Sequence, residues 1–214
     1  MLRLLFPPKC TLCRNLLDKR ETDLCHHCRI HTPGFSRPKR NIPFIAHWTA
    51  LWYYKDDVRK SIHRFKFGNA RQYADAYARL LAARLENTFS EAFDILTWVP
   101  VSSLRRLKRG YDQSALLARS VGRELKIPAT GVLKKIRHTP PQSGLRDAAQ
   151  RRANVLGAYK AIKRQTLAGK RILLLDDVIT TGATASECAH VLLMAGAKEV
   201  YFAAVAAASD DNNK

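Results

Sequence analysis

Residues 172–184 read Ile-Leu-Leu-Leu-Asp-Asp-Val-Ile-Thr-Thr-Gly-Ala-Thr. Four consecutive apolar residues are typical of a strand that is buried on both faces, as in a parallel sheet. Two carboxylates end the predicted strand at Leu175, and a turn rich in hydroxyls leads into a helix predicted over 183–195. Ligands of open parallel sheets bind at the carboxyl ends of the strands, so this strand, turn and helix predict a binding site.

The residue types in the turn indicate which ligand it takes. Backbone N–H groups at a helix N-terminus attract anions, and the hydroxyls of Thr180, Thr181 and Thr184 add donors. Gly182 lets the backbone close around a phosphate. The two carboxylates before the turn suit the hydroxyls of a sugar or a divalent ion. A sugar phosphate is therefore the predicted ligand class.

Other readings of this segment explain less of it. The acidic pair can serve only to cap the helix, but capping leaves the Thr-Thr-Gly-Ala-Thr run without a purpose. The turn contains no Gly-Lys-Ser/Thr, which excludes a Walker phosphate loop. No strand is followed by Gly-x-Gly-x-x-Gly, which excludes a dinucleotide fingerprint.

The remaining sequence predicts an α/β fold with a mainly parallel sheet. Strands are predicted over 48–54, 93–101, 171–175 and 199–206, and helices over 56–65, 73–85, 113–125 and 183–195. Strands that alternate with helices imply right-handed crossovers. The chain divides into a cysteine-rich segment at 1–35, a linker at 36–47 with two prolines and a basic cluster, and a globular domain at 48–214.

Four cysteines form two pairs, Cys10-x-x-Cys13 and Cys25-x-x-Cys28. Two such turns together supply the four thiolates of a closed structural zinc site. Metal binding also provides folding energy that a 35-residue segment cannot obtain from apolar burial. Disulfides and a redox dithiol are the alternatives, and both are less favoured for this spacing without a secretion signal. The fifth cysteine, Cys188, falls on a predicted helix and is expected in the core.

The charge of the chain is strongly positive and concentrated. Lys and Arg number 37 against 18 Asp and Glu, a net charge of +19, and residues 101–171 carry 18 basic and 3 acidic side chains. Such a block attracts polyanions, including nucleic acid. Lys66 and the aromatic run Trp48, Trp52, Tyr53 and Tyr54 either offer stacking surfaces for bases or belong to the core, the commoner role. No catalytic base is identifiable.

Residues 172–184 resemble the phosphoribosyl-pyrophosphate (PRPP) loop of type I phosphoribosyltransferases at every position. The segments 98–103, 106–113 and 139–142, with Arg151, Arg152 and Asn154, are in addition similar to the ComF (ComFC) family, although Asp112 stands where that family usually has Asn. The resemblance covers nearly the whole chain and implies a zinc finger followed by a phosphoribosyltransferase-like domain.

The resemblance assigns roles to individual residues. Asp176 and Asp177 would contact the ribose hydroxyls of PRPP, which binds with Mg²⁺, and the turn Thr180, Thr181, Gly182, Ala183 and Thr184 would wrap its 5′-phosphate. The segment 101–103 would approach the pyrophosphate, and 134–152 would form a mobile lid. Contacts to pyrophosphate, or alternatively to nucleic-acid phosphates, are expected from Ser102, Ser103, Arg105, Arg106, Arg109, Lys134, Lys135 and Arg137.

Two functions follow as hypotheses. The favoured one, taken from the resemblance, is a cytoplasmic protein that handles single-stranded DNA during natural transformation beside the competence helicase of the ComF operon, and retains a PRPP-Mg²⁺ pocket. The alternative is an active phosphoribosyltransferase that transfers ribose phosphate to a nitrogen nucleophile. A third possibility, a zinc-stabilised scaffold that only recruits partners, explains neither the basic block nor the intact loop. Pro7 and Pro8 interrupt the apolar start too early for a signal peptide, and no apolar run suits a membrane span.

Overall fold

The computed structural model describes residues 7–90, 93–137, 139 and 148–209. Its centre is a four-stranded parallel sheet in the order β1-β6-β5-β2. The strands are β1 (Trp48–Tyr53), β2 (Ile95–Trp98), β5 (Arg171–Ile179) and β6 (Glu199–Ala207). A separate antiparallel pair joins β3 (Leu133–Lys135) to β4 (Tyr159–Ala161). The predicted α/β class with a mainly parallel sheet is confirmed.

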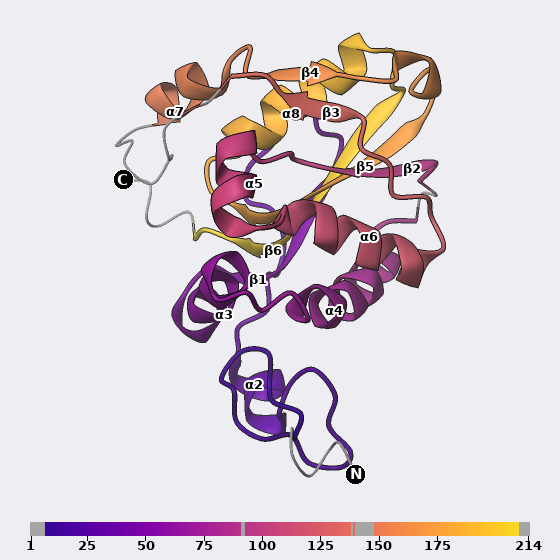
Figure 1. Ribbon diagram of the computed structural model, residues 1–214. Helices are drawn as coiled ribbons and strands as arrows, with labels where there is room; N and C mark the ends of the chain where they lie inside the picture. Colours follow the sequence, from indigo (N-terminus) through magenta and orange to yellow (C-terminus); the bar gives the residue numbers. More distant parts are fainter. Residues whose placement is uncertain (1–6, 91–92, 138, 140–147, 210–214) are drawn as a thin grey trace.

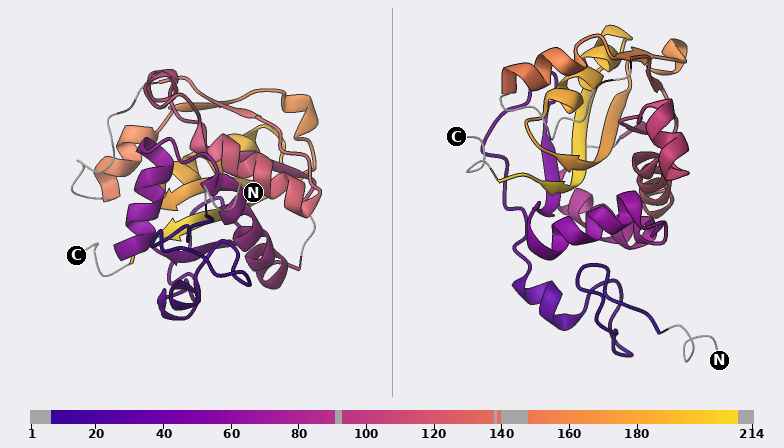
Figure 2. Two further views of the ribbon diagram at one scale, coloured as in Figure 1. Left: turned by 60° about the horizontal axis from the view of Figure 1, so that its bottom comes forward. Right: turned by 60° about the vertical axis from the view of Figure 1, so that its left-hand side comes forward.

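Helices cover both faces of the sheet (Figures 1 and 2). One layer contains α3 (Asp56–Phe67), α4 (Tyr73–Thr88) and α6 (Gln113–Leu125), and the opposite layer contains α8 (Ala183–Met194) and the β3–β4 pair. The shorter helices are α2 (His26–His31), α5 (Ser103–Arg109), α7 (Ala148–Val155) and the 3₁₀ turn η2 (Arg164–Thr166). No helix within the described ranges is both long and apolar enough to cross a membrane.

The apolar run at the start of β5 explains why the sheet is buried on both faces. Ile172 and Leu174 point into the cluster beneath α8, whereas Leu173 and Leu175 point toward α4 and α6. All four side chains are completely buried. Alternate residues of a strand point to opposite faces, so a continuous apolar run is needed where both faces are covered.

Strand β5 is longer than the sequence predicted. The prediction that it ends at Leu175 is wrong, because β5 continues to pair with β6 as far as Ile179, opposite Ala207. Asp176 and Asp177 therefore lie inside the strand rather than after it. Because β2 ends at Trp98, opposite Leu175, both acidic residues lie beyond the last residue pair of β2 and β5.

Regular structure occurs in a segment to which the sequence assigned no element and in the segment predicted as a lid. Residues 103–109 form α5, which begins after Ser102, whose hydroxyl accepts from the Arg105 amide, and ends at Gly110 with a φ of 77°. Lys134 lies in β3, and the later part of the predicted lid forms α7. Residues 138 and 140–147 of that lid lie outside the described residues.

Residues 36–47 contain no helix or strand, as their two prolines predict. They nevertheless pack against the sheet and are not a free tether. Ile42 is buried in the cluster beneath α8, and the Ala46 amide donates to the Val200 carbonyl. The Trp48 indole, itself buried, donates to the Arg40 carbonyl at 3.1 Å. The segment thus runs along the edge of the domain that holds the predicted ligand loop.

Candidate phosphate-binding cavity and zinc ribbon

A cavity of about 320 Å³ opens at the carboxyl ends of β2 and β5. It brings together the end of β5, the turn that follows it and the start of α8, as the sequence predicted. Its polar and charged lining residues are Tyr54, Lys66, Arg105, Arg109, Lys135, Thr139, Arg151, Tyr159, Asp176, Asp177, Thr180 and Thr184. Five cations therefore face two carboxylates, which suits a ligand with several negative charges.

The carboxylates of the acidic pair have different partners. Asp177 is buried and forms an ion pair with Lys66 of α3 at 2.7 Å. Burial acts to lower the pKa of Lys66, but the Asp177 carboxylate outweighs it, so this pKa lies above its ordinary value. Asp176 accepts a hydrogen bond from the Ser114 hydroxyl of α6 at 2.8 Å. Burial, and then the neighbouring Asp177, raises the pKa of Asp176 from 3.8 to about 7.

The turn between β5 and α8 has a backbone conformation that favours glycine at position 182. Gly182 has a φ of 81°, a left-handed conformation that favours glycine, and it immediately precedes α8. A Cβ at this position would lie 3.1 Å from the Ile42 side chain. Gly182 occupies the N-cap of α8 and neither carboxylate caps the helix, so the reading of the acidic pair as a helix cap is wrong. The N-terminal turn of α8, with the positive end of its dipole, faces the cavity through Ala183 and Thr184.

The predicted linker also holds this turn from outside. The Arg40 guanidinium donates to the Thr180 carbonyl, and Ile42 fills the space beside Gly182. Thr181 does not line the cavity; its hydroxyl accepts from the Ala183 amide at 3.4 Å. Contacts from the linker and from the Thr181 hydroxyl therefore fix the shape of the turn.

The structure divides the predicted phosphate contacts into three groups. Arg105, Arg109 and Lys135 line the cavity. Ser103, Arg106 and Lys134 line a neighbouring groove. The other two have structural partners: Ser102 caps α5, and Arg137 donates to the carbonyls of Asn154 and Leu156.

Burial alters the cations of the cavity. It lowers the pKa of Lys135 to about 8, with a smaller contribution from Arg105, and it lowers the pKa of Arg109 as well. Lys135 also donates to the Thr139 hydroxyl at 2.8 Å, and Arg105 donates to the Thr139 carbonyl at 3.0 Å. A bound polyanion would favour the charged forms of Lys135 and Arg109 and raise their pKa values, and these charges would in turn stabilise the bound anion.

Several residues of the site were missed or misassigned from the sequence. Lys66 was considered for base stacking, but it reaches into the cavity from α3. Ser114 was given no role, although it contacts Asp176, and Thr139, named only within the predicted lid and the segment 139–142, lies in the cavity wall. Trp48 and Trp52 are buried, in keeping with the core reading. Cys188 is fully buried, as predicted.

Asp112, which departs from the usual Asn of the ComF pattern, accepts two backbone hydrogen bonds, of which the single side-chain oxygen of Asn could accept only one. Its carboxylate accepts from the Ala115 amide at 3.0 Å and caps α6. The other oxygen accepts from the Val101 amide at 3.3 Å. Burial raises the pKa of this carboxyl. Its hydrogen bonds thus go to the backbone.

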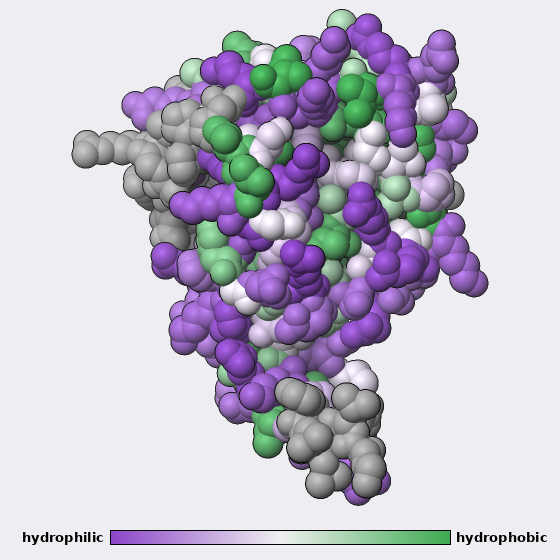
Figure 3. Space-filling view, viewed as in Figure 1, coloured by the Kyte–Doolittle hydropathy of each residue, from purple (hydrophilic) through white to green (hydrophobic). Residues whose placement is uncertain are grey.

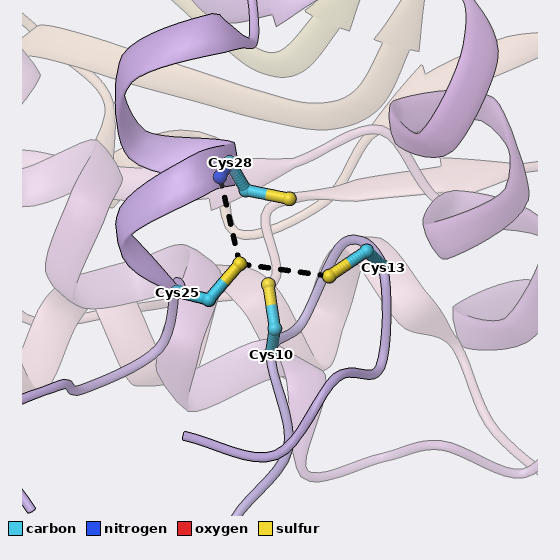
Figure 4. A group of neighbouring side chains, drawn as sticks. All are labelled: Cys10, Cys13, Cys25 and Cys28. Carbon is cyan, nitrogen blue, oxygen red and sulfur yellow. Dashed lines mark hydrogen bonds between the residues drawn. The ribbon is translucent and has the colours of Figure 1, made fainter. Parts of the chain in front are cut away.

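The four N-terminal cysteines converge on one point (Figure 4). Their sulfur atoms all lie within 4.8 Å of one another, and those of Cys13 and Cys25 are 3.6 Å apart. A tetrahedral zinc with bonds of about 2.3 Å requires sulfurs about 3.8 Å apart, so the arrangement fits that ion. Cys10, Cys25 and Cys28 are buried, and no disulfide links any of the five cysteines. The donor set supports a structural zinc.

The cysteine segment is fastened to the main domain through α3 and α4. The Ser61 hydroxyl donates to the Thr11 carbonyl at 2.5 Å, and the Arg64 guanidinium donates to the Leu12 carbonyl. Asp23 forms an ion pair with Arg79 of α4 at 2.5 Å. Leu12 is fully buried in the same cluster as α3 and α4.

Comparison with known proteins agrees with both halves of this architecture. Residues 1–39 match the double zinc ribbon domain, and residues 112–214 match the phosphoribosyl transferase domain. Competence protein F of Haemophilus influenzae is 28% identical over 222 residues, spanning 90% of this chain and 93% of that protein.

Two further relatives were found in other bacteria. The DNA utilization protein YhgH of Salmonella typhimurium is 28% identical over 200 residues, spanning 89% of this chain and 86% of that protein. Competence protein ComFC of Bacillus subtilis is 25% identical over 196 residues, spanning 87% and 78%. Because these relatives extend across both the ribbon and the parallel-sheet domain, the chain belongs to the ComF family of phosphoribosyltransferase-like proteins with an N-terminal zinc ribbon.

Proposed function

We propose that the cavity binds PRPP together with Mg²⁺. The observation that carries this proposal is that the acidic pair and the N-terminus of α8 face one cavity lined by five cations. In such a complex, Asp176 and Asp177 would accept hydrogen bonds from the ribose hydroxyls. The turn from Thr180 to Thr184 would donate to the 5′-phosphate through its amides and hydroxyls.

The donor chemistry of the cavity fits magnesium. Mg²⁺ prefers carboxylate oxygens, retains several waters and takes its other ligands from substrate phosphates. Asp176 and Asp177 would hold it, and when bound it would neutralise charge on the pyrophosphate. The ion pair between Lys66 and Asp177 occupies one of these oxygens, so Lys66 shares this carboxylate with any incoming cation.

Arg105, Arg109 and Lys135 would contact the pyrophosphate group. They surround the cavity from α5 and β3, at the edge where β2 ends. Fixed cations stabilise charge that develops on a leaving group without reorganisation. Ser103, Arg106 and Lys134 lie outside this cavity and are free to serve another anion.

In the cell, the protein would act in the cytoplasm in the uptake and use of DNA. Its relatives are named competence and DNA utilization proteins. The excess of positive charge supports binding of single-stranded DNA during natural transformation. The competence helicase of the ComF operon is the partner expected beside it.

The alternative function is an active phosphoribosyltransferase with an unknown nitrogen nucleophile as acceptor. The complete acidic pair and phosphate turn favour it, because binding DNA does not require them. Incubating the protein with PRPP and Mg²⁺, with and without single-stranded DNA, and measuring pyrophosphate release separates the two functions. Sustained release indicates an enzyme, whereas binding without release indicates a ligand-regulated binding protein.

The binding site itself is tested by calorimetry with PRPP and Mg²⁺. The double variant Asp176→Ala/Asp177→Ala should lose binding and keep the far-ultraviolet spectrum of the wild type. The control is Asp94→Ala, an exposed acid outside the cavity, which should bind as the wild type does. Equal affinity of the double variant and the wild type would refute the site.

A further inference from the structure

A second hollow, of about 490 Å³, adjoins the proposed PRPP cavity. Its walls come from the end of β2, from α5 and α6, and from β3, and we call it the α5–α6 groove. Pro100, Val101 and Lys135 line both the cavity and the groove, so the two meet at these residues. In the view of Figure 3, hydrophilic side chains dominate the face that carries α5 and α6, with smaller apolar areas between them.

The groove carries more positive than negative charge among the residues that the structure describes. Arg106, Arg119, Lys134 and Lys135 line it, against one carboxylate, that of Asp112. The Asp112 carboxylate accepts hydrogen bonds from two backbone amides and is directed to them. Among the residues described, neither of the two arginines nor Lys134 forms an ion pair with a carboxylate. Cations gathered without counter-charge favour an anionic ligand.

The groove also contains a flat aromatic wall. The Trp98 indole is half-buried at the end of β2, and the Arg119 guanidinium lies over it at 5.6 Å from the ring centroid. Gly131 lies close to the ring, because a Cβ there would lie 3.1 Å from two of the indole carbons. The ring therefore lies next to backbone at Gly131 and forms part of the groove surface.

We propose that the α5–α6 groove binds single-stranded nucleic acid, with backbone phosphates on Arg106, Arg119 and Lys134 and a base stacked on Trp98. Cations beside an aromatic side chain are the combination that single-strand binding surfaces use. A duplex would place phosphates on the same cations but would keep its bases stacked inside, away from the indole. The inference rests on the proposed function for the ligand class and adds the location of the strand beside the PRPP cavity.

The test measures affinity for a fluorescently labelled oligothymidylate of about 20 nucleotides by anisotropy, across salt from about 0.05 to 0.3 M. The variant Arg106→Ala/Arg119→Ala/Lys134→Ala should weaken binding by about tenfold or more and reduce the slope of log affinity against log salt by about 2. The matched control is Arg59→Ala/Lys60→Ala/Arg164→Ala, which removes three exposed cations outside the groove. It should change affinity by no more than about threefold.

A second variant separates stacking from charge. Trp98→Leu should lower the affinity by about 5- to 100-fold and leave the salt slope unchanged. Spectra and urea unfolding establish that each variant is folded. The inference is overturned if the wild type does not bind the oligonucleotide, if the groove and control variants lose affinity equally, or if polyglutamate competes as well as unlabelled oligothymidylate does.

The same variants distinguish this inference from the PRPP proposal. None of Arg106, Arg119 and Lys134 lines the PRPP cavity, so the groove variant should bind PRPP with Mg²⁺ as the wild type does. Loss of oligonucleotide binding with intact PRPP binding supports the groove. A wild type that binds oligonucleotide through the groove but no PRPP refutes the proposed ligand and leaves the groove standing.

Discussion

Replacing Asp176 by Asn should make the ligand-free protein more stable at neutral and alkaline pH. The Asn side-chain oxygen can still accept from the Ser114 hydroxyl and the Asp177 amide, which both bond the same oxygen of Asp176. The substitution therefore removes the charge and keeps both hydrogen bonds. What changes is the cost of ionising a half-buried carboxyl next to a second one.

The size of the effect follows from the pKa of Asp176. Its folded value of about 7 lies above the ordinary value of 3.8, so the folded protein holds this proton more tightly than the unfolded chain does. Stability is consequently lost as the pH rises from about 4 to about 7, by up to about 4 kcal/mol, since one pKa unit corresponds to about 1.4 kcal/mol. Asn does not ionise, so the free energy of unfolding of the variant does not fall in this way.

Urea unfolding at several pH values, without PRPP or Mg²⁺, measures the difference. At pH about 8, Asp176→Asn should unfold with a free energy up to about 4 kcal/mol above the wild type, and near pH 4 the advantage should shrink to under about 1 kcal/mol. The control Asp177→Asn should instead lower stability at pH about 8, because it leaves Lys66 without its ion-pair partner. An advantage of Asp176→Asn that is absent, or equal at both pH values, would falsify the reasoning.

Three further outcomes are expected. Gly182→Ala should lower the free energy of unfolding by about 1–3 kcal/mol and weaken PRPP binding, because φ is 81° and the new Cβ would meet Ile42; wild-type values in calorimetry and urea unfolding would contradict this. Cys25→Ser should reduce the zinc content measured by atomic emission, and a stoichiometric metal content would count against the four-sulfur site. Leu174→Ala should cost about 2–5 kcal/mol in urea unfolding, since this side chain is fully buried, whereas Leu107→Ala, at an exposed position, should cost little; similar costs would argue against the packing described.

The elements with a strong apolar pattern were predictable from the sequence. The helix over 113–125 agrees with α6 in both bounds, because its apolar residues recur at helical spacing. Helix α5 was missed because it buries no side chain. It is defined by Ser102 at one end and Gly110 at the other, and local caps give a weaker signal than periodicity.

The site was predictable where it is contiguous in the sequence. The acidic pair and the phosphate turn share one short segment, and the structure brings them to one cavity. Lys66 reaches the same cavity from α3, and Ser114 contacts the acidic pair from α6. Their contribution depends on how the helices pack against the sheet, which no local pattern records. The extension of β5 likewise depends on pairing with a strand later in the chain.

Helix α3 contacts both the cysteine segment and the cavity. Ser61 and Arg64 donate hydrogen bonds to the backbone between Cys10 and Cys13. Lys66 of the same helix forms an ion pair with Asp177 in the cavity. If α3 moved when the metal is lost, the Lys66 ammonium group would move away from the Asp177 carboxylate. By thermodynamic reciprocity, any such dependence of sugar-phosphate affinity on the metal implies an equal dependence of metal affinity on the sugar phosphate. The metal affinity of the cysteine segment would then depend on whether the cavity is occupied, although no described residue of that segment lines the cavity.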